Sequence, residues 1–136
     1  MLEDLTVHDA LILIAVCAAK EEADNADNHI EYEKLIADLV QDHPIFSGLA
    51  DSIDPSINKY MNMIDNIIDD VNYVSAATKV LKPELKEVAF TWAAKIIMPD
   101  GVLTKVRKNI LEKYALLLNI DNKDGPQILV KISNEQ

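Results

Sequence analysis

The sequence predicts an all-α fold in a single domain spanning residues 1–136, and three observations lead to it. Apolar residues recur at steps of three and four along most of the chain, which is the spacing of one helix face. Only 3 residues are glycine and 5 are proline, too few for the many tight turns of a β-sandwich or barrel. No segment alternates apolar and polar residues as a half-buried strand does. We therefore expect a bundle of five to seven helices.

The first expected helix follows Thr6, a good N-cap residue, and runs to about Ala23. Its segment 11–19 is apolar on every side, so this helix should be central and largely buried. Cys17 is the only cysteine and lies in this segment. We interpret it as a small buried side chain in a reducing compartment.

The second expected helix begins near Asn28, which forms a capping-box pattern with Glu31. It ends at His43, because the residue before a proline is disfavoured in the α conformation. Residues 44–55 should then connect it to a third helix. That helix starts at Ser56 and continues to about Val80, with one apolar stripe formed by Ile57, Met61, Ile64, Ile68 and Val71.

Pro83 suits the first position of a further helix, which should run to Met98 with Phe90 and Trp92 in the core. Asp100-Gly101 closes it, since glycine tolerates the left-handed conformation at a helix end. The next helix is capped by Thr104, and its expected core stripe is Leu103, Val106, Ile110, Tyr114 and Leu117. A last short helix starts near Pro126 and buries Ile128, Leu129 and Ile132.

The charge distribution favours some functions and disfavours others. The net charge is −10, which disfavours nucleic acid as a partner because phosphate binding needs clustered Lys and Arg. Residues 1–75 hold 3 basic and 16 acidic residues, whereas residues 76–113 hold 8 basic and 4 acidic residues. Such a molecule is electrostatically polar, and either face could meet a protein partner; solvated helix faces are the simpler interpretation.

Membrane insertion and secretion are not predicted. The apolar run 10–19 is shorter than the ~20 residues that a bilayer span needs. The N-terminus carries Glu3 and Asp4, where a signal peptide needs positive charge. We therefore expect a cytoplasmic protein.

The chain contains an internal repeat at an offset of 76 residues. Each copy has a mostly apolar helix, an acidic loop and an amphipathic helix. The first copy carries Asp24-Asn25, Asn28 and Glu31, and the second carries Asp100-Gly101, Thr104 and Arg107. Asn and Gly are the residues that best tolerate the left-handed conformation, and Asn28 and Thr104 are both N-cap types.

This layout resembles the TerB-like family of tellurite-resistance proteins. The resemblance is carried by Ala93-Ala94, Asp100-Gly101-Val102-Leu103-Thr104 and the helix close Leu118-Asn119-Ile120, together with the first copy over residues 15–40. It implies two related helical hairpins, a stress-associated role, and a divalent cation bound at the paired acidic loops. Arg107 stands where the family carries a second glutamate.

The densest supply of metal ligands is the stretch 21–33, which holds six acids and His29. Asp24 could bind an ion from the loop, Glu31 could reach back from the first helical turn, and Asp100 could join from the second hairpin. Carboxylates suit Mg²⁺, Ca²⁺ or Mn²⁺. In the alternative interpretation Glu31 is only the capping-box acid, and its neighbours favour a helix N-terminus.

Two helix faces with clustered charge are further candidate binding surfaces. Lys105, Arg107, Lys108 and Lys113 form a basic face that could bind an anion or an acidic partner, such as the acidic half of another copy in a homodimer. Asp65, Asp69 and Asp70 are expected on a solvated face. No nucleophile or acid–base pair typical of an enzyme stands out. The prediction is a non-enzymatic accessory protein that binds other proteins, with a divalent-metal sensor or buffer as the alternative.

Overall fold

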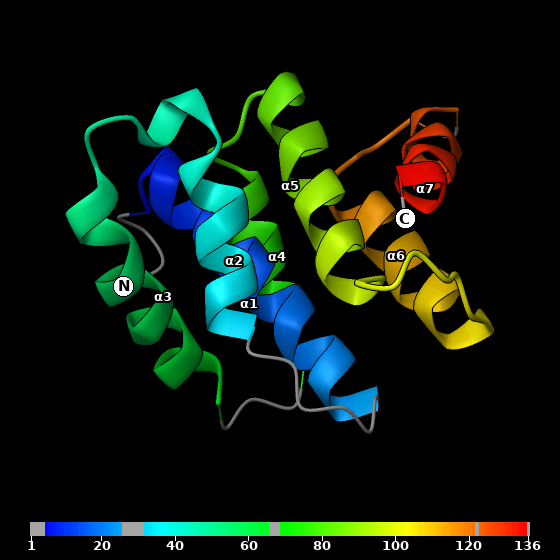
Figure 1. Cartoon of the computed structure of the whole chain (residues 1–136), viewed down its shortest axis with the longest axis horizontal. Coiled ribbons are helices and arrows are strands. Elements are labelled where there is room, and N and C mark those ends of the chain that lie inside the picture. Colours follow the sequence, from blue (N-terminus) through cyan, green and yellow to red (C-terminus); the bar gives the residue numbers. More distant parts are fainter. Residues whose placement is uncertain (1–4, 26–31, 66–68, 122, 136) are drawn as a thin grey trace.

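The computed structural model describes residues 5–25, 32–65, 69–121 and 123–135, and these residues form seven α-helices and one 3-10 turn (Figure 1). The α-helices are α1 (Val7–Asn25), α2 (Tyr32–Gln41), α3 (Ala50–Ile64), α4 (Val71–Thr78), α5 (Pro83–Ile97), α6 (Lys105–Leu117) and α7 (Asp124–Glu135). The 3-10 turn is Pro44–Phe46. No strand occurs in these ranges, so the predicted all-α class is confirmed.

Helix α1 is the centre of the bundle. All ten of its residues from Ala10 to Ala19 are buried, as the apolar run predicted. α1 contacts α2, α3, α4, α5 and α6, so it is surrounded on every side. In Figure 1 α2 and α3 lie to one side of it, and α5, α6 and α7 follow on the other. A helix that is apolar all round has no face suited to water, which explains this position.

The start of α1 is a reciprocal cap. The Thr6 hydroxyl accepts a hydrogen bond from the Asp9 N–H at 3.0 Å, and the Asp9 carboxylate accepts one from the Thr6 N–H at 3.4 Å. Two N–H groups that lack helical partners are satisfied in this way. The predicted start is confirmed, and the helix extends two residues beyond Ala23.

α2 packs as its apolar spacing predicted, with Ile36 and Val40 buried. Its predicted cap at Asn28 and Glu31 lies outside the described residues. The chain leaves the helix before Pro44, and His43 starts the 3-10 turn by accepting a hydrogen bond from the Ile45 N–H at 3.2 Å.

The single helix predicted from Ser56 to Val80 is wrong at both ends. α3 begins at Ala50 and contains Pro55. The buried stripe Ile53, Ile57, Tyr60 and Ile64 begins two residues before the proline, and the exposed ring of Pro55 lies on another side of the helix. Packing of this stripe outweighs the hydrogen bond that proline removes.

The same segment also ends earlier than predicted, at Ile64, and α4 is a separate helix. The Asp69 carboxylate accepts a hydrogen bond from the Val71 N–H at 3.0 Å, which is how a side chain starts a new helix. Asp70 was expected in solvent, but it is buried. Its partners on α6 hold the chain at this point, as described below.

α5 starts at Pro83 as predicted and buries Phe90 and Trp92. The loop after it has Gly101 in the left-handed conformation, with φ of 74°. Thr104 caps α6 by accepting a hydrogen bond from the Arg107 N–H at 3.2 Å, which confirms that prediction.

The predicted core stripe of α6 is only partly correct. Ile110 and Tyr114 are buried, but Leu103 and Val106 are exposed, and Leu111 and Leu118 are buried instead. α7 covers α5 with Ile132 buried and Ile128 and Leu129 partly buried. In the described ranges, no helix is long and apolar enough to cross a bilayer.

Candidate functional site

Arg107 joins three parts of the chain at one guanidinium group. One nitrogen, Nη2, donates to the Glu22 carboxylate of α1 at 2.8 Å. The other, Nη1, donates to the Asp100 carboxylate at 2.6 Å and to the Val102 carbonyl at 2.7 Å. The Arg107 and Glu22 side chains are 11% and 3% exposed, so this ion pair is nearly excluded from water. A planar guanidinium suits this geometry because its donors form a rigid fork.

A second cation of α6 makes a similar connection one and a half turns later. The Lys113 ammonium group donates to the Glu21 carboxylate at 2.9 Å and to the Asp70 carboxylate at 3.1 Å. The other oxygen of buried Asp70 accepts a hydrogen bond from the Tyr114 hydroxyl at 2.7 Å. Buried acids are tolerated only when paired and hydrogen-bonded, and both conditions hold for Asp70.

These contacts stabilise the charged forms of the basic groups. Burial works against the charges of Arg107 and Lys113, but the hydrogen bonds to their carboxylates outweigh it and raise the pKa of both groups. The Val102 N–H and then Arg107 lower the pKa of the Asp100 carboxyl group. Burial, followed by nearby Cys17 and Asp70, raises the pKa of Tyr114.

Cys17 is buried within this region, as predicted. Burial raises the pKa of its thiol far above the usual range, and the charges of Asp70 and Glu21 act in the same direction. A thiol in such surroundings stays protonated and is a poor nucleophile. Its role is packing of α1.

The predicted basic face of α6 is thus divided in two. Arg107 and Lys113 turn towards acids on α1 and at the start of α4, whereas Lys105 and Lys108 are exposed. The residues that sequence reasoning missed are Glu22 and Asp70. One signal for Glu22 was available, because it follows the buried Ala18 and Ala19 at steps of four and three, on the same helix face.

The structure describes the side chain of only one of the three predicted metal ligands, Asp100. Asp100 is bound to Arg107. Glu31 and the side chain of Asp24 lie outside the described residues, so the set Asp24, Glu31 and Asp100 stays a prediction. Within the described ranges, no three His, Cys, Asp or Glu side chains form a group that could hold a metal ion.

Two histidines have structural partners. The His8 Nε2 atom lies 2.8 Å from the Ile45 carbonyl oxygen, and its ring meets Phe46 edge to face. His43 caps the 3-10 turn and meets Trp92 in the same manner. Both rings therefore hold the connector between α2 and α3 against the bundle.

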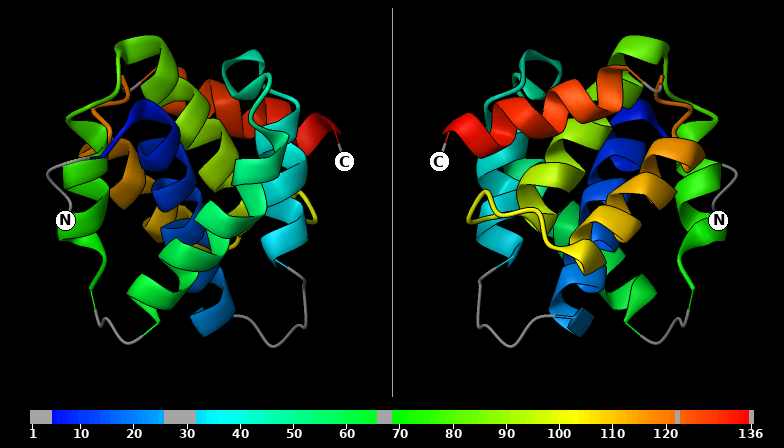
Figure 2. Two further views of the ribbon diagram at one scale, coloured as in Figure 1. Left: turned by 90° about the vertical axis from the view of Figure 1, so that its left-hand side faces the viewer. Right: turned by 90° about the vertical axis from the view of Figure 1, so that its right-hand side faces the viewer.

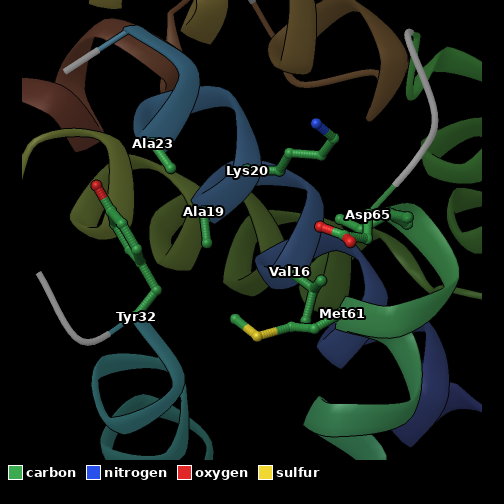
Figure 3. A pocket seen from close by; sticks show the side chains of 8 residues that line it. Val16, Ala19, Lys20, Ala23, Tyr32, Met61 and Asp65 are labelled. Carbon is green, nitrogen blue, oxygen red and sulfur yellow. The ribbon is translucent and has the colours of Figure 1, made fainter. Parts of the chain in front are cut away.

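A small pocket of about 220 Å³ lies between α1, α2 and α3 (Figure 3). Val16, Ala19, Met61 and Ile64 form its apolar wall. Figure 3 shows Lys20 and Asp65 on one side of it and Tyr32 on the other. The pocket therefore combines an apolar wall with the charged side chains of Lys20 and Asp65.

A polar groove of about 460 Å³ runs between α2 and α3. Its charged lining is mainly acidic, with Glu33, Asp38 and Asp54 against the single cation Lys34. This groove belongs to the acidic half that the charge counts predicted.

An apolar groove of about 430 Å³ lies between α6 and α7. Both helices are seen in the right panel of Figure 2. Leu111 and Ala115 of α6 form one wall, and Leu129 and Val130 of α7 form the other. Phe90 of α5 and Leu103 also line it. Two large apolar side chains at this groove are exposed to solvent: Val130 is 60% exposed and Leu103 is 39% exposed.

The comparisons with known proteins add no relative. No family model, no curated protein and no solved structure matches the chain. The functional interpretation therefore depends on the residues and their geometry.

Proposed function

We propose that this chain is a TerB-like, stress-associated accessory protein that acts as a protein-interaction module. The observation that carries the proposal is the α6–α7 groove, where Leu103 and Val130 remain exposed beside apolar walls. Exposed apolar side chains that border one groove are typical of interaction sites, whereas single exposed ones are ordinary. We propose that this groove is the docking site.

The energetics of the groove favour this use. Fully burying an exposed Val or Leu side chain contributes roughly 1.5–3 kcal/mol. Leu103 is 39% exposed, Val130 is 60% exposed and Leu129 is partly buried, so covering what remains exposed would contribute roughly 1.5–4 kcal/mol in total. Phe90, which lines the groove, belongs to the buried core, so the site is on a rigid support.

The proposal that the chain is TerB-like is supported by residues 92–119, which contain the second copy of the repeat. Gly101 is left-handed, Thr104 caps the following helix, and Asn119 is left-handed after it, with φ of 57°. These are the backbone features that the resemblance implies for residues 92–119. The stress-associated role is proposed from that resemblance.

The docking proposal can be tested by photo-crosslinking in the cell of origin. A photoreactive phenylalanine analogue replaces Leu129 in the α6–α7 groove or, as a control at a different groove, the exposed Asn58 of α3, which lines the polar α2–α3 groove. We expect defined protein adducts from position 129 that are absent from position 58. The same adducts from both positions, or none from position 129, would refute docking at the groove.

The stress role needs its own test. A chromosomal deletion and a Val130→Asp variant are compared with an Asn58→Asp control during growth with and without oxyanion or oxidative stress. We expect deletion and Val130→Asp to impair growth only under stress, and Asn58→Asp to match the wild type. A deletion strain that grows normally under every stress contradicts this part of the proposal.

A further inference from the structure

The rim of the α6–α7 groove carries two opposite charges on one face of α6. Lys108 and Glu112 both line the groove, both are exposed, and they are four residues apart, which is about one helical turn. No ion pair engages either side chain in the described part of the chain, in contrast to Arg107 and Lys113. The rim therefore presents one unpaired cation and one unpaired anion beside the apolar walls.

A rim with one charge of each sign is complementary to itself. In a twofold-symmetric pair, residue i of one copy meets residue j of the other, and j meets i. Two antiparallel α6 helices with the twofold axis between positions 108 and 112 would bring Lys108 of each copy to Glu112 of the other. A groove suited to a purely acidic or purely basic partner would carry rim charges of a single sign.

We propose that the occupant of the α6–α7 groove is a second copy of this chain, which docks with its own α6–α7 face. This inference rests on the proposed function, since it names the partner of the same groove. Val130 and Leu103 of each copy would be covered by the apolar wall of the other, and two reciprocal Lys108–Glu112 pairs would set the register.

The charge distribution favours this face over the rest of the molecule for self-association. Each copy carries a net charge of −10, and residues 1–75 hold 16 of the 23 acids. The groove between α2 and α3 is lined by Glu33, Asp38 and Asp54, so two copies meeting there would repel each other. α6 instead has the cations Lys105 and Lys108 exposed with the single acid Glu112.

The test uses sedimentation equilibrium of the purified full chain from about 1 to 300 micromolar, near 0.15 M salt, where the ~8 Å Debye length leaves only close charge pairs effective. We expect a monomer–dimer equilibrium in the wild type. Lys108→Glu places acid against acid at the interface, and Glu112→Lys places cation against cation. Each variant alone should weaken dimerisation at least about tenfold.

Mixing the two variants is the decisive step. A Lys108→Glu chain has two acids on the rim and a Glu112→Lys chain has two cations, so an equimolar mixture should form a heterodimer although neither variant dimerises well alone. The double variant Lys108→Glu/Glu112→Lys should recover homodimerisation. Lys34→Glu and Asp38→Lys on α2 repeat the same charge changes at the same spacing on another face, and they should leave dimerisation unchanged.

The inference is overturned if the wild type stays monomeric throughout the concentration range. It is also overturned if a dimer forms that is insensitive to both rim variants, or if their mixture does not associate. A monomeric chain that still gives crosslinks to other proteins from position 129 would refute the self-association alone and leave the docking function standing. A monomer without such crosslinks would refute both.

Discussion

Arg107 of α6 and Glu22 of α1 are 85 residues apart in the sequence, and their side chains are joined by a 2.8 Å ion pair that is almost excluded from water. The same guanidinium binds Asp100 and the Val102 carbonyl. One cation therefore connects the end of the central helix to the loop before α6. It does so at the loop where the sequence predicted a metal ion between acids of the two hairpins.

Replacement of Arg107 should strongly destabilise the fold. In Arg107→Met the Glu22 carboxylate stays buried without its cation, and breaking a buried pair in this way costs about 3–5 kcal/mol. Arg107→Lys should cost less but not be neutral, because one ammonium group cannot reproduce the forked contacts. Urea unfolding at neutral pH measures both effects.

Two comparisons make this test specific. Lys105→Met removes an exposed cation from the same helix and should change the free energy of unfolding by less than about 0.5 kcal/mol. The double variant Glu22→Gln/Arg107→Met should be more stable than Arg107→Met, since it leaves no unpaired buried charge. Equal stability of Arg107→Met and Lys105→Met would show that the ion pair contributes nothing.

The Tyr114–Asp70 hydrogen bond gives a second prediction. Tyr114→Phe keeps the buried ring but removes the donor to a buried carboxylate, and this should cost about 1–3 kcal/mol. In a double-mutant cycle with Asp70→Asn, the two effects should be non-additive, because the residues are in direct contact. Additive effects in this cycle would contradict the coupling that the geometry implies.

The control for this measurement is Tyr73→Phe. The Tyr73 side chain is partly buried, and its hydroxyl has no hydrogen-bond partner in the described part of the chain. Its removal should be close to neutral. A loss as large as that of Tyr114→Phe would indicate a general effect of removing a hydroxyl group.

The features that could be predicted from the sequence are those set by neighbouring residues. Thr6 and Thr104 start their helices by hydrogen bonds to residues three positions on, and Pro83 starts its helix through its fixed φ, so local patterns sufficed. The all-apolar character of segment 10–19 likewise left only a central position for α1. All-α class and helix starts follow from short-range physics of this kind.

The features that could not be predicted depend on distant partners. The break between α3 and α4 places Asp70 against Lys113 and Tyr114, which are 43 and 44 residues away. Arg107 looked like one member of an exposed basic face because Glu22 is 85 residues distant. The α6–α7 groove depends on how α7 docks against α5, and apolar spacing within one helix carries no information on that.

Alkaline pH should destabilise the fold through Tyr60. Burial, followed by the charge of Asp9, raises the pKa of Tyr60 to about 12. The unfolded chain releases this proton near pH 10, so the contribution to stability is fully present below about pH 10 and is lost as pH rises towards 12. The raised pKa values of Lys113 and Tyr114 act in the same direction.

Urea midpoints between about pH 9 and 12 measure this effect. Tyr60→Phe cannot ionise at this position, so its stability should fall less steeply over that range than that of the wild type. Ultraviolet absorbance of tyrosinate in the folded protein gives an independent titration. Superimposable pH profiles of wild type and Tyr60→Phe would contradict the prediction.

The divalent-metal hypothesis makes a separate prediction. A metal that binds only the native state at 100 times its dissociation constant adds about 2.7 kcal/mol, which raises the melting temperature by several degrees. Chelator-treated protein is melted with Mg²⁺, Ca²⁺, Mn²⁺ or Zn²⁺ at matched ionic strength. A selective rise that is lost in Asp24→Asn but kept in the exposed-acid control Asp51→Asn supports the site. If no ion raises the melting temperature, the metal site is refuted at those concentrations.

The end of α6 provides a last prediction, because Asn119 is the one non-glycine residue with positive φ among those the structure describes. The Ile120 N–H donates to the Ala115 carbonyl at 2.9 Å, which closes the helix in a turn that needs a left-handed residue at position 119. Asparagine tolerates this conformation better than other side chains, and glycine tolerates it best. Asn119→Gly should therefore be neutral or slightly stabilising, whereas Asn119→Val should cost about 1–2 kcal/mol. Thermal melts of the two variants decide the matter: a Val variant as stable as the Gly variant would mean that the chain closes α6 without the left-handed residue.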